Sequence, residues 1–196
     1  MADDKTLLVL TCARSGSKFM ARFLNPLGIE VGHEKMGPDG AVGYPCVSWI
    51  SPRQPRFRGM NMGQIWHQVR HPLAVIASLV SYGPIPQTPH WKLTGTYLPL
   101  PNELLPRCMA VWYRWNLRCL AVAEWSYRVE SVYNGSRTYR EMLRRLRLPL
   151  DTPLPKIARN VNTRPHLPLT WAELKDADAG LASGIRWLAR RYGYGA

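Results

Sequence analysis

The feature that most constrains the fold is a short aliphatic run followed by a small, polar loop and then by helical periodicity. Residues 7–10 are all Leu or Val and predict a buried strand. The loop at 11–18 contains Gly16, which marks a break between two regular elements. Apolar residues then recur at helical spacing: Phe19, Met20, Phe23, Leu24 and Leu27. A strand joined to a helix in this way is typical of an α/β fold.

The strand-then-helix order repeats along the chain. Short apolar runs predict further strands at 28–32, 64–69 and 127–132. Apolar residues at helical spacing predict helices at 72–80, 103–125, 138–148 and from 171 onward. Segments 35–63 and 83–106 are rich in Gly or Pro, and we expect them to form irregular surface loops.

This alternation predicts a single α/β domain that spans residues 1–196. Strands linked by helical crossovers are parallel, and helices cover both faces of such a sheet. We therefore expect a three-layer sandwich with a central parallel sheet. Ligands of these folds bind beyond the carboxyl ends of the strands, so the loops after the first three strands are the places to look for a site.

The charge of the chain predicts an anionic partner. The formal net charge is +13, and 20 of the 26 basic residues are arginines. Arg suits forked contacts to phosphate and sulfate oxygens, so a nucleic acid, an anionic surface or a highly charged small molecule would fit.

The sequence also bears on the cellular compartment. No run reaches the ~20 apolar residues that a membrane-spanning helix needs. The first five residues are polar and acidic, unlike a secretory signal. The cysteines show no CxxC or zinc spacing: Cys12, Cys46, Cys108 and Cys119. We expect a cytoplasmic protein with reduced thiols.

The first candidate site is the loop after the first strand. There the backbone N–H groups and the dipole of the following helix both favour an anion. Gly16 allows close approach of the backbone, Ser15 and Ser17 add hydroxyl groups, and Arg14 and Lys18 add charge. The loop is not a Walker A motif, because Thr11 stands in place of the first Gly and Ser17 precedes Lys18.

The second candidate site follows the strand at 64–69. Arg70 leaves the strand end, Pro72 suits the first turn of a helix, and Ser78 lies on that helix. A phosphate group would fit between the Arg70 guanidinium and the Ser78 hydroxyl. Arg14 and Arg70 are 56 residues apart, each at a strand-to-helix junction, and we expect the two junctions at the same edge of the sheet.

Together the two segments resemble the cofactor loops of sulfotransferases that use 3′-phosphoadenosine 5′-phosphosulfate (PAPS). Arg14-Ser15-Gly16-Ser17 is similar to the loop that holds the 5′-phosphosulfate, and Arg70 through Ser78 to the segment that holds the 3′-phosphate. The resemblance implies a P-loop-nucleotide-kinase-like sulfotransferase fold, PAPS as co-substrate and 3′-phosphoadenosine 5′-phosphate (PAP) as product. The cofactor-binding residues that it implies are Arg14, Ser15, Gly16, Ser17, Lys18, Phe19, Arg70 and Ser78.

Weaker likenesses continue downstream. Residues 127–130 resemble a Tyr- and Glu-containing strand of the family. Residues 157–162 resemble a basic cofactor-contacting segment of tyrosylprotein-type sulfotransferases, which implies a cofactor contact for Arg159, and residues 188–194 resemble their last helix. The sequence departs from the family pattern at His71 and Lys18, and it has no Arg-Lys-Gly segment. These departures affect the prediction of the acceptor class more than the prediction of the cofactor.

Sulfuryl transfer needs a cation at the leaving phosphate oxygen and a base for the acceptor hydroxyl. The resemblance implies that Arg14 is the cation. Glu34 resembles the carboxylate base of the tyrosylprotein-type enzymes, and His33 could fill the role of the histidine in the cytosolic class. Neighbours on an extended chain point apart, so we expect one of the two to act as the base. We expect no metal, because arginines and backbone donors supply the positive charge.

The acceptor is not readable from the sequence. An arginine-rich helix could be a solvated face or could guide an anionic acceptor such as a glycan or an acidic peptide: Arg137, Arg140, Arg144, Arg145 and Arg147. The aromatic residues Trp112, Tyr113 and Trp115 suit helix packing. Two other functions stay open: a nucleotide-binding kinase-like enzyme, disfavoured by the missing Walker lysine, and a non-catalytic nucleic-acid-binding protein, disfavoured by the lack of a recognisable nucleic-acid-binding motif.

Overall fold

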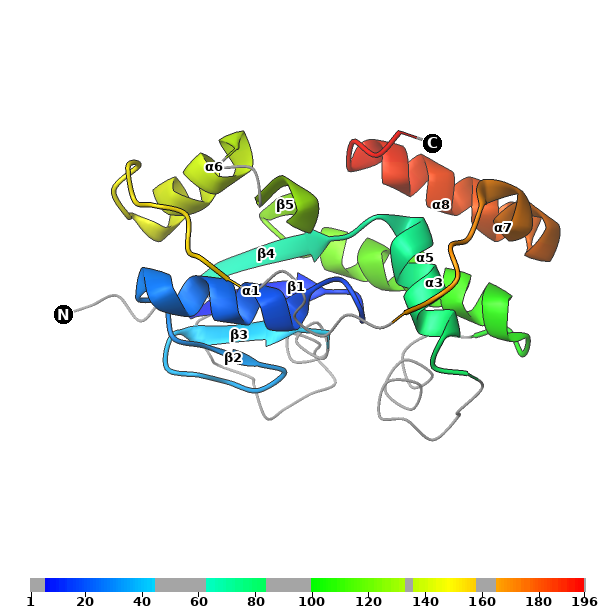
Figure 1. Cartoon of the computed structure of the whole chain (residues 1–196), viewed down its shortest axis with the longest axis horizontal. Coiled ribbons are helices and arrows are strands. Elements are labelled where there is room, and N and C mark those ends of the chain that lie inside the picture. Colours follow the sequence, from blue (N-terminus) through cyan, green and yellow to red (C-terminus); the bar gives the residue numbers. More distant parts are fainter. Residues whose placement is uncertain (1–5, 45–62, 84–99, 133–135, 158–164, 196) are drawn as a thin grey trace.

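The computed structural model describes residues 6–44, 63–83, 100–132, 136–157 and 165–195. Within these ranges the chain forms an α/β fold with one five-stranded sheet, in which every neighbouring pair of strands is parallel (Figure 1). The strand order is β2-β3-β1-β4-β5. The strands are β1 (Leu7–Thr11), β2 (Val31–His33), β3 (Gly40–Gly43), β4 (Gln64–Val69) and β5 (Trp125–Arg128).

Helices of the described residues connect β1 to β2 and β4 to β5, and they form the carboxyl-terminal part of the fold. The α-helices are α1 (Ser17–Leu24), α3 (Pro72–Val80), α5 (Leu104–Leu120), α6 (Arg137–Leu146), α7 (Trp171–Ala177) and α8 (Ala179–Arg191). Two 3-10 helices, η1 (Asn25–Leu27) and η3 (Val129–Val132), follow α1 and β5. Of the described residues, none forms a helix that is both long and apolar enough to cross a membrane.

Helices cover both faces of the sheet, and β1 shows why its sequence is apolar throughout. Leu8 and Leu10 belong to the core cluster that includes residues of α3, α5 and α8, whereas Leu7 and Val9 belong to the cluster with α1 and α6. Successive side chains of a strand point to opposite faces, so a strand covered on both sides needs apolar residues at every position. The predicted parallel sheet with helices on both faces is confirmed.

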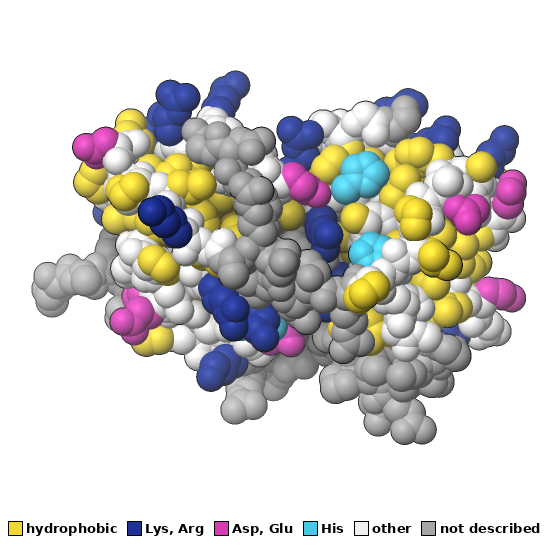
Figure 2. All heavy atoms as spheres, in the orientation of Figure 1, with side chains coloured by type: hydrophobic (Ala, Val, Ile, Leu, Met, Phe, Trp, Pro, Cys, Tyr) yellow, Lys and Arg dark blue, Asp and Glu magenta, His cyan; other side chains and the backbone are white. Residues whose placement is uncertain are grey.

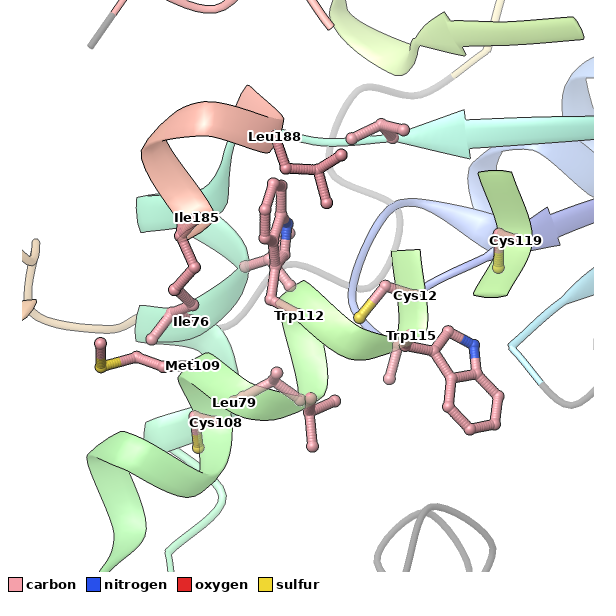
Figure 3. Packing of buried hydrophobic residues seen from close by; sticks show 14 of the residues in the cluster. Cys12, Ile76, Leu79, Cys108, Met109, Trp112, Trp115, Cys119, Ile185 and Leu188 are labelled. Carbon is pink, nitrogen blue, oxygen red and sulfur yellow. The ribbon is translucent and has the colours of Figure 1, made fainter. Parts of the chain in front are cut away.

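The larger core cluster fills the space between the sheet and α3, α5 and α8 (Figure 3). Trp112 and Trp115 are fully buried there, which confirms that these aromatic residues of α5 serve packing. Cys108 and Cys119 are buried, as their spacing in a helical stretch predicted, and Cys12 is buried with them. Cys46 lies outside the described residues.

The structure corrects several element predictions. Segment 35–63, expected to be irregular, contains β3. The second strand begins at Val31 rather than at residue 28, because Gly28, with φ 80°, ends η1. The strand expected at 127–132 is β5 at Trp125–Arg128, and the residues after it form η3. Helix α5 ends at Leu120, five residues before the predicted end.

Candidate functional site

The two candidate loops lie at the same edge of the sheet. β1 and β4 are parallel neighbours, with Thr11 beside Gln68 at their carboxyl ends. The chain leaves β1 toward α1 and leaves β4 toward α3, so both strand-to-helix junctions start from adjacent positions. This confirms the predicted proximity of the loop at Arg14 and the loop at Arg70.

The loop after β1 is a tight turn with two left-handed residues. Arg14 has φ 68° and Gly16 has φ 85°. A left-handed conformation at a residue other than Gly costs about 1–2 kcal/mol, so Arg14 must be held by its surroundings. Arg70 Nη1 donates a hydrogen bond to the Arg14 carbonyl at 3.2 Å, and the Ser15 N–H donates to the Cys12 carbonyl at 3.2 Å.

Gln68 supports the same turn from the neighbouring strand. Its Nε2 donates to the Ser15 carbonyl at 2.7 Å, and its Oε1 accepts from the Tyr127 hydroxyl at 3.1 Å. Gln68 is fully buried, and burial raises the pKa of Tyr127 well above its usual range, so the phenol remains a donor. Neither residue was identified from the sequence as part of the site, because their partners are distant in the chain.

The Arg14 side chain connects the first loop to α3. Its Nε donates to Ser78 Oγ at 2.9 Å, and its Nη1 donates to the Tyr82 hydroxyl at 3.1 Å. The guanidinium carbon lies 5.2 Å from the centroid of the Tyr82 ring. Tyr82 follows Ser78 by four residues, one helical turn, and that spacing is the only signal by which the sequence could have revealed it.

Ser78 and Ser15 are less accessible than the sequence suggested. Ser78 is 2% exposed, and Ser15 is fully buried. Among the described residues the Ser15 hydroxyl oxygen has no hydrogen-bond partner. A buried hydroxyl without a partner is energetically unfavourable, and an acceptor brought by a ligand would relieve this.

His33 and Glu34 lie beside the start of α1. His33 Nε2 is 3.0 Å from Ser17 Oγ and 3.9 Å from Glu34 Oε1. The expectation that these neighbours point apart is wrong, because Glu34 has φ 56° and its left-handed conformation turns its side chain back toward His33. Ser17 and Glu34 both approach the same ring nitrogen, whereas a Ser–His–carboxylate triad uses both nitrogens of the ring.

The surroundings of His33 favour its neutral form. Burial lowers the pKa of His33, the Glu34 charge opposes this, and the Lys18 charge adds to the lowering. A neutral imidazole has a nitrogen lone pair that accepts a proton. His33 therefore has the protonation state that a general base needs, and the exposed Glu34 carboxylate lies next to it.

The other predicted site residues differ in accessibility. Lys18 is exposed on the first turn of α1, whereas the Phe19 side chain is buried in the core cluster with α6. Arg159 lies outside the described residues. The described part of the chain has no group of three or more His, Cys, Asp or Glu side chains that could hold a metal ion.

The arrangement as a whole suits an anion. Arg14, Lys18 and Arg70 supply positive charge around the amino-terminal end of α1, where backbone N–H groups lack intrahelical acceptors. A scan against protein-family models, a search of curated proteins and a search of solved structures found no match for this chain. The function is therefore inferred from the sequence motifs and the geometry of the site.

Proposed function

We propose that the protein is a PAPS-dependent sulfotransferase with the P-loop-like fold of that family, which moves a sulfuryl group from PAPS to a hydroxyl of an acceptor. The observation that supports this most directly is the hydrogen bond of 2.9 Å from Arg14 Nε to Ser78 Oγ. These residues are 64 positions apart in the chain. The sequence resemblance assigns them to opposite ends of one nucleotide, and the fold brings them into contact.

The residues of the first loop fit a phosphosulfate group. Gly16 has the left-handed conformation that most other residues adopt only at a cost, and this conformation shapes the turn at the start of α1. The first turn of α1 offers N–H groups and the positive end of the helix dipole. In this proposal the Ser15 hydroxyl, which has no partner among the described residues, donates to the same group.

The residues of the second loop fit the 3′-phosphate, on one condition. Arg70 and Ser78 supply a guanidinium and a hydroxyl, the donors that bind a dianion well. The Ser78 hydroxyl already accepts a hydrogen bond from Arg14 and is almost fully buried. A phosphate therefore reaches Ser78 only when the Arg14 side chain moves away, which would free the Arg14 guanidinium for the phosphosulfate end.

In the proposed reaction an acceptor oxygen attacks sulfur in line with the leaving group. A new sulfur–oxygen bond forms, and the bond between sulfur and the phosphate oxygen of PAPS breaks. Negative charge grows on that phosphate oxygen, and Arg14 stabilises it in the transition state. The acceptor proton passes to His33 or Glu34, which lie 3.9 Å apart at the end of β2.

A basic groove beside β5, the edge strand farthest from β2, suggests the kind of acceptor. It has a volume of about 900 Å³ and lies between β5 and α6. Its basic lining residues are Arg128, Arg137, Arg140, Arg144 and Arg145. Figure 2 shows Lys and Arg side chains along the upper margin of the molecule, over α6 and α8. In this proposal the positive charge of this groove attracts an anionic acceptor, such as a glycan or an acidic peptide, in the cytoplasm. The groove itself lies across the sheet from His33 of β2.

Ligand-induced stabilisation tests the function against the two alternatives. A ligand that binds only the folded protein raises its melting temperature by mass action. We expect PAP to raise it, and ATP and an oligonucleotide to have little effect. Transfer of labelled sulfate from PAPS to a panel of tyrosine peptides, glycans, phenols and lipids then identifies the acceptor. Stabilisation by ATP alone, or by the oligonucleotide alone, would replace the proposal with the corresponding alternative.

A further inference from the structure

The peptide group that joins Arg70 to His71 is held at both of its polar atoms. The Arg70 carbonyl accepts a hydrogen bond from Trp112 Nε1 at 3.3 Å. The His71 N–H donates to Glu130 Oε1 at 2.9 Å. His71 precedes α3 and its side chain makes no capping hydrogen bond, so the main chain is fixed here by Trp112 and Glu130. Fixing this peptide plane sets the direction in which the Arg70 side chain leaves the backbone.

Glu130 is itself held by the segment after α8. Its Oε2 accepts a hydrogen bond from the Tyr194 hydroxyl at 2.8 Å, and that hydroxyl lies 3.3 Å from the Val69 carbonyl. The rings of Tyr194 and His71 meet edge to face, with centroids 5.1 Å apart. Tyr194 therefore contacts the Arg70–His71 turn directly through a ring and indirectly through Glu130.

Arg128 fixes the Tyr194 segment in turn. Its Nη1 donates to the Gly193 carbonyl at 2.7 Å, and its guanidinium carbon lies 5.4 Å from the centroid of the Tyr194 ring. Burial and the nearby Glu130 carboxylate raise the pKa of Tyr194, so the phenol keeps its proton and remains a donor. The contacts form a chain from the carboxyl-terminal segment to the base of the Arg70 side chain.

We propose that Glu130 and Tyr194 are positioning residues for the 3′-phosphate subsite. They orient the Arg70–His71 peptide, and through it the guanidinium that reaches the Arg14 carbonyl at 3.2 Å. This inference rests on the proposed function, because it assigns Arg70 to a phosphate. It adds that the segment after α8, distant in sequence from both loops, contributes to recognition of that phosphate.

The test compares two nucleotides that differ only in the 3′-phosphate: PAP and adenosine 5′-monophosphate. We expect the wild-type protein to bind PAP more tightly than the monophosphate. In Tyr194→Phe the affinity for PAP falls on the order of tenfold, the factor that corresponds to one ordinary hydrogen bond. The affinity for the monophosphate falls less, because that nucleotide lacks the phosphate that Arg70 binds and senses Arg70 only through the Arg14 carbonyl. Tyr192→Phe is the matched control, since its hydroxyl lies 3.5 Å from His67 Nδ1, away from Glu130.

A second variant keeps the test independent of Tyr194. Glu130→Gln retains the shape of the side chain, but the amide presents a donor at one of the two positions where Glu130 accepts. It should lower PAP selectivity in the same way. An equal loss of affinity for both nucleotides, unchanged selectivity, or failure of both variants to fold would show a purely structural role and overturn the inference. Wild-type protein that binds no PAP would overturn the proposed function itself.

Discussion

Acidification should destabilise the protein through His67. This residue of β4 is fully buried, and its Nε2 lies 3.0 Å from Asn116 Oδ1. Ser126 Oγ and the Tyr192 hydroxyl lie 3.4 and 3.5 Å from its Nδ1. Burial lowers the pKa of His67 from 6.5 to about 4, although the hydrogen bond with Asn116 opposes the change.

The sign and size of the effect follow from this pKa. The unfolded chain binds a proton at His67 below pH 6.5, whereas the folded chain binds it only near pH 4. The stability associated with the neutral ring is therefore complete above pH 6.5 and is lost as the pH falls through about 4. The full loss amounts to about 3 kcal/mol, a large part of the stability of an ordinary domain.

Urea unfolding at several pH values between 7 and 4 measures this loss. Other residues also contribute to the pH dependence of stability, so the informative quantity is the difference between wild type and His67→Gln. The free energy of unfolding of the variant should fall less steeply with decreasing pH, by about 3 kcal/mol over the whole range. The exposed His166, replaced by Gln, is the control. If the free energy of unfolding of wild type and of His67→Gln fell in parallel with decreasing pH, the assignment of this pH dependence to His67 would be refuted.

Three further predictions concern the proposed reaction. In Arg14→Ala, turnover should fall about 10²–10³-fold while the affinity for PAP falls far less. Near-normal turnover would show that Arg14 does not stabilise the transition state. Comparison of Glu34→Gln with His33→Ala in a turnover assay identifies the base, and wild-type rates in both variants would exclude the pair. The apparent affinity for an anionic acceptor should weaken steeply with added salt, and replacing Arg137 and Arg140 by Gln should reduce that salt dependence. An apparent affinity of the wild type that does not change with salt would show that the groove does not attract the acceptor.

The sequence was sufficient to predict an element of the fold where the local hydrophobic pattern agrees with the burial of the residues. The aliphatic run of β1 is buried on both faces, so its composition alone identified it. The positions of Arg14 and Arg70 followed from the same logic, since the ends of neighbouring parallel strands meet at one edge. β3 was missed because its sequence, Gly-Ala-Val-Gly, has little strand propensity. Its pairing requires a bare backbone: a Cβ on Gly40 would lie 1.9 Å from the Leu7 carbonyl oxygen.

The parts of the site that sequence reasoning missed depend on long-range contacts. Gln68 reaches Ser15 across 53 residues, and Tyr194 reaches Glu130 across 64. Neither pair has a local spacing that would reveal it, because the contacts arise only when the sheet and α8 are assembled. The relation between His33 and Glu34 was mispredicted for a different reason. It depends on the left-handed conformation of Glu34. A glycine would have signalled that conformation in the sequence, but this position holds a glutamate.

A crystal structure of the protein soaked with PAP tests the central claim most directly. We expect the nucleotide to bridge the two loops, with its 5′-phosphate at the start of α1 and its 3′-phosphate between Arg70 and Ser78. The Arg14 side chain should then have left Ser78 Oγ, to which it donates at 2.9 Å in this structure. Density for PAP elsewhere on the molecule, or a site that stays empty at saturating nucleotide, would contradict the proposed sulfotransferase.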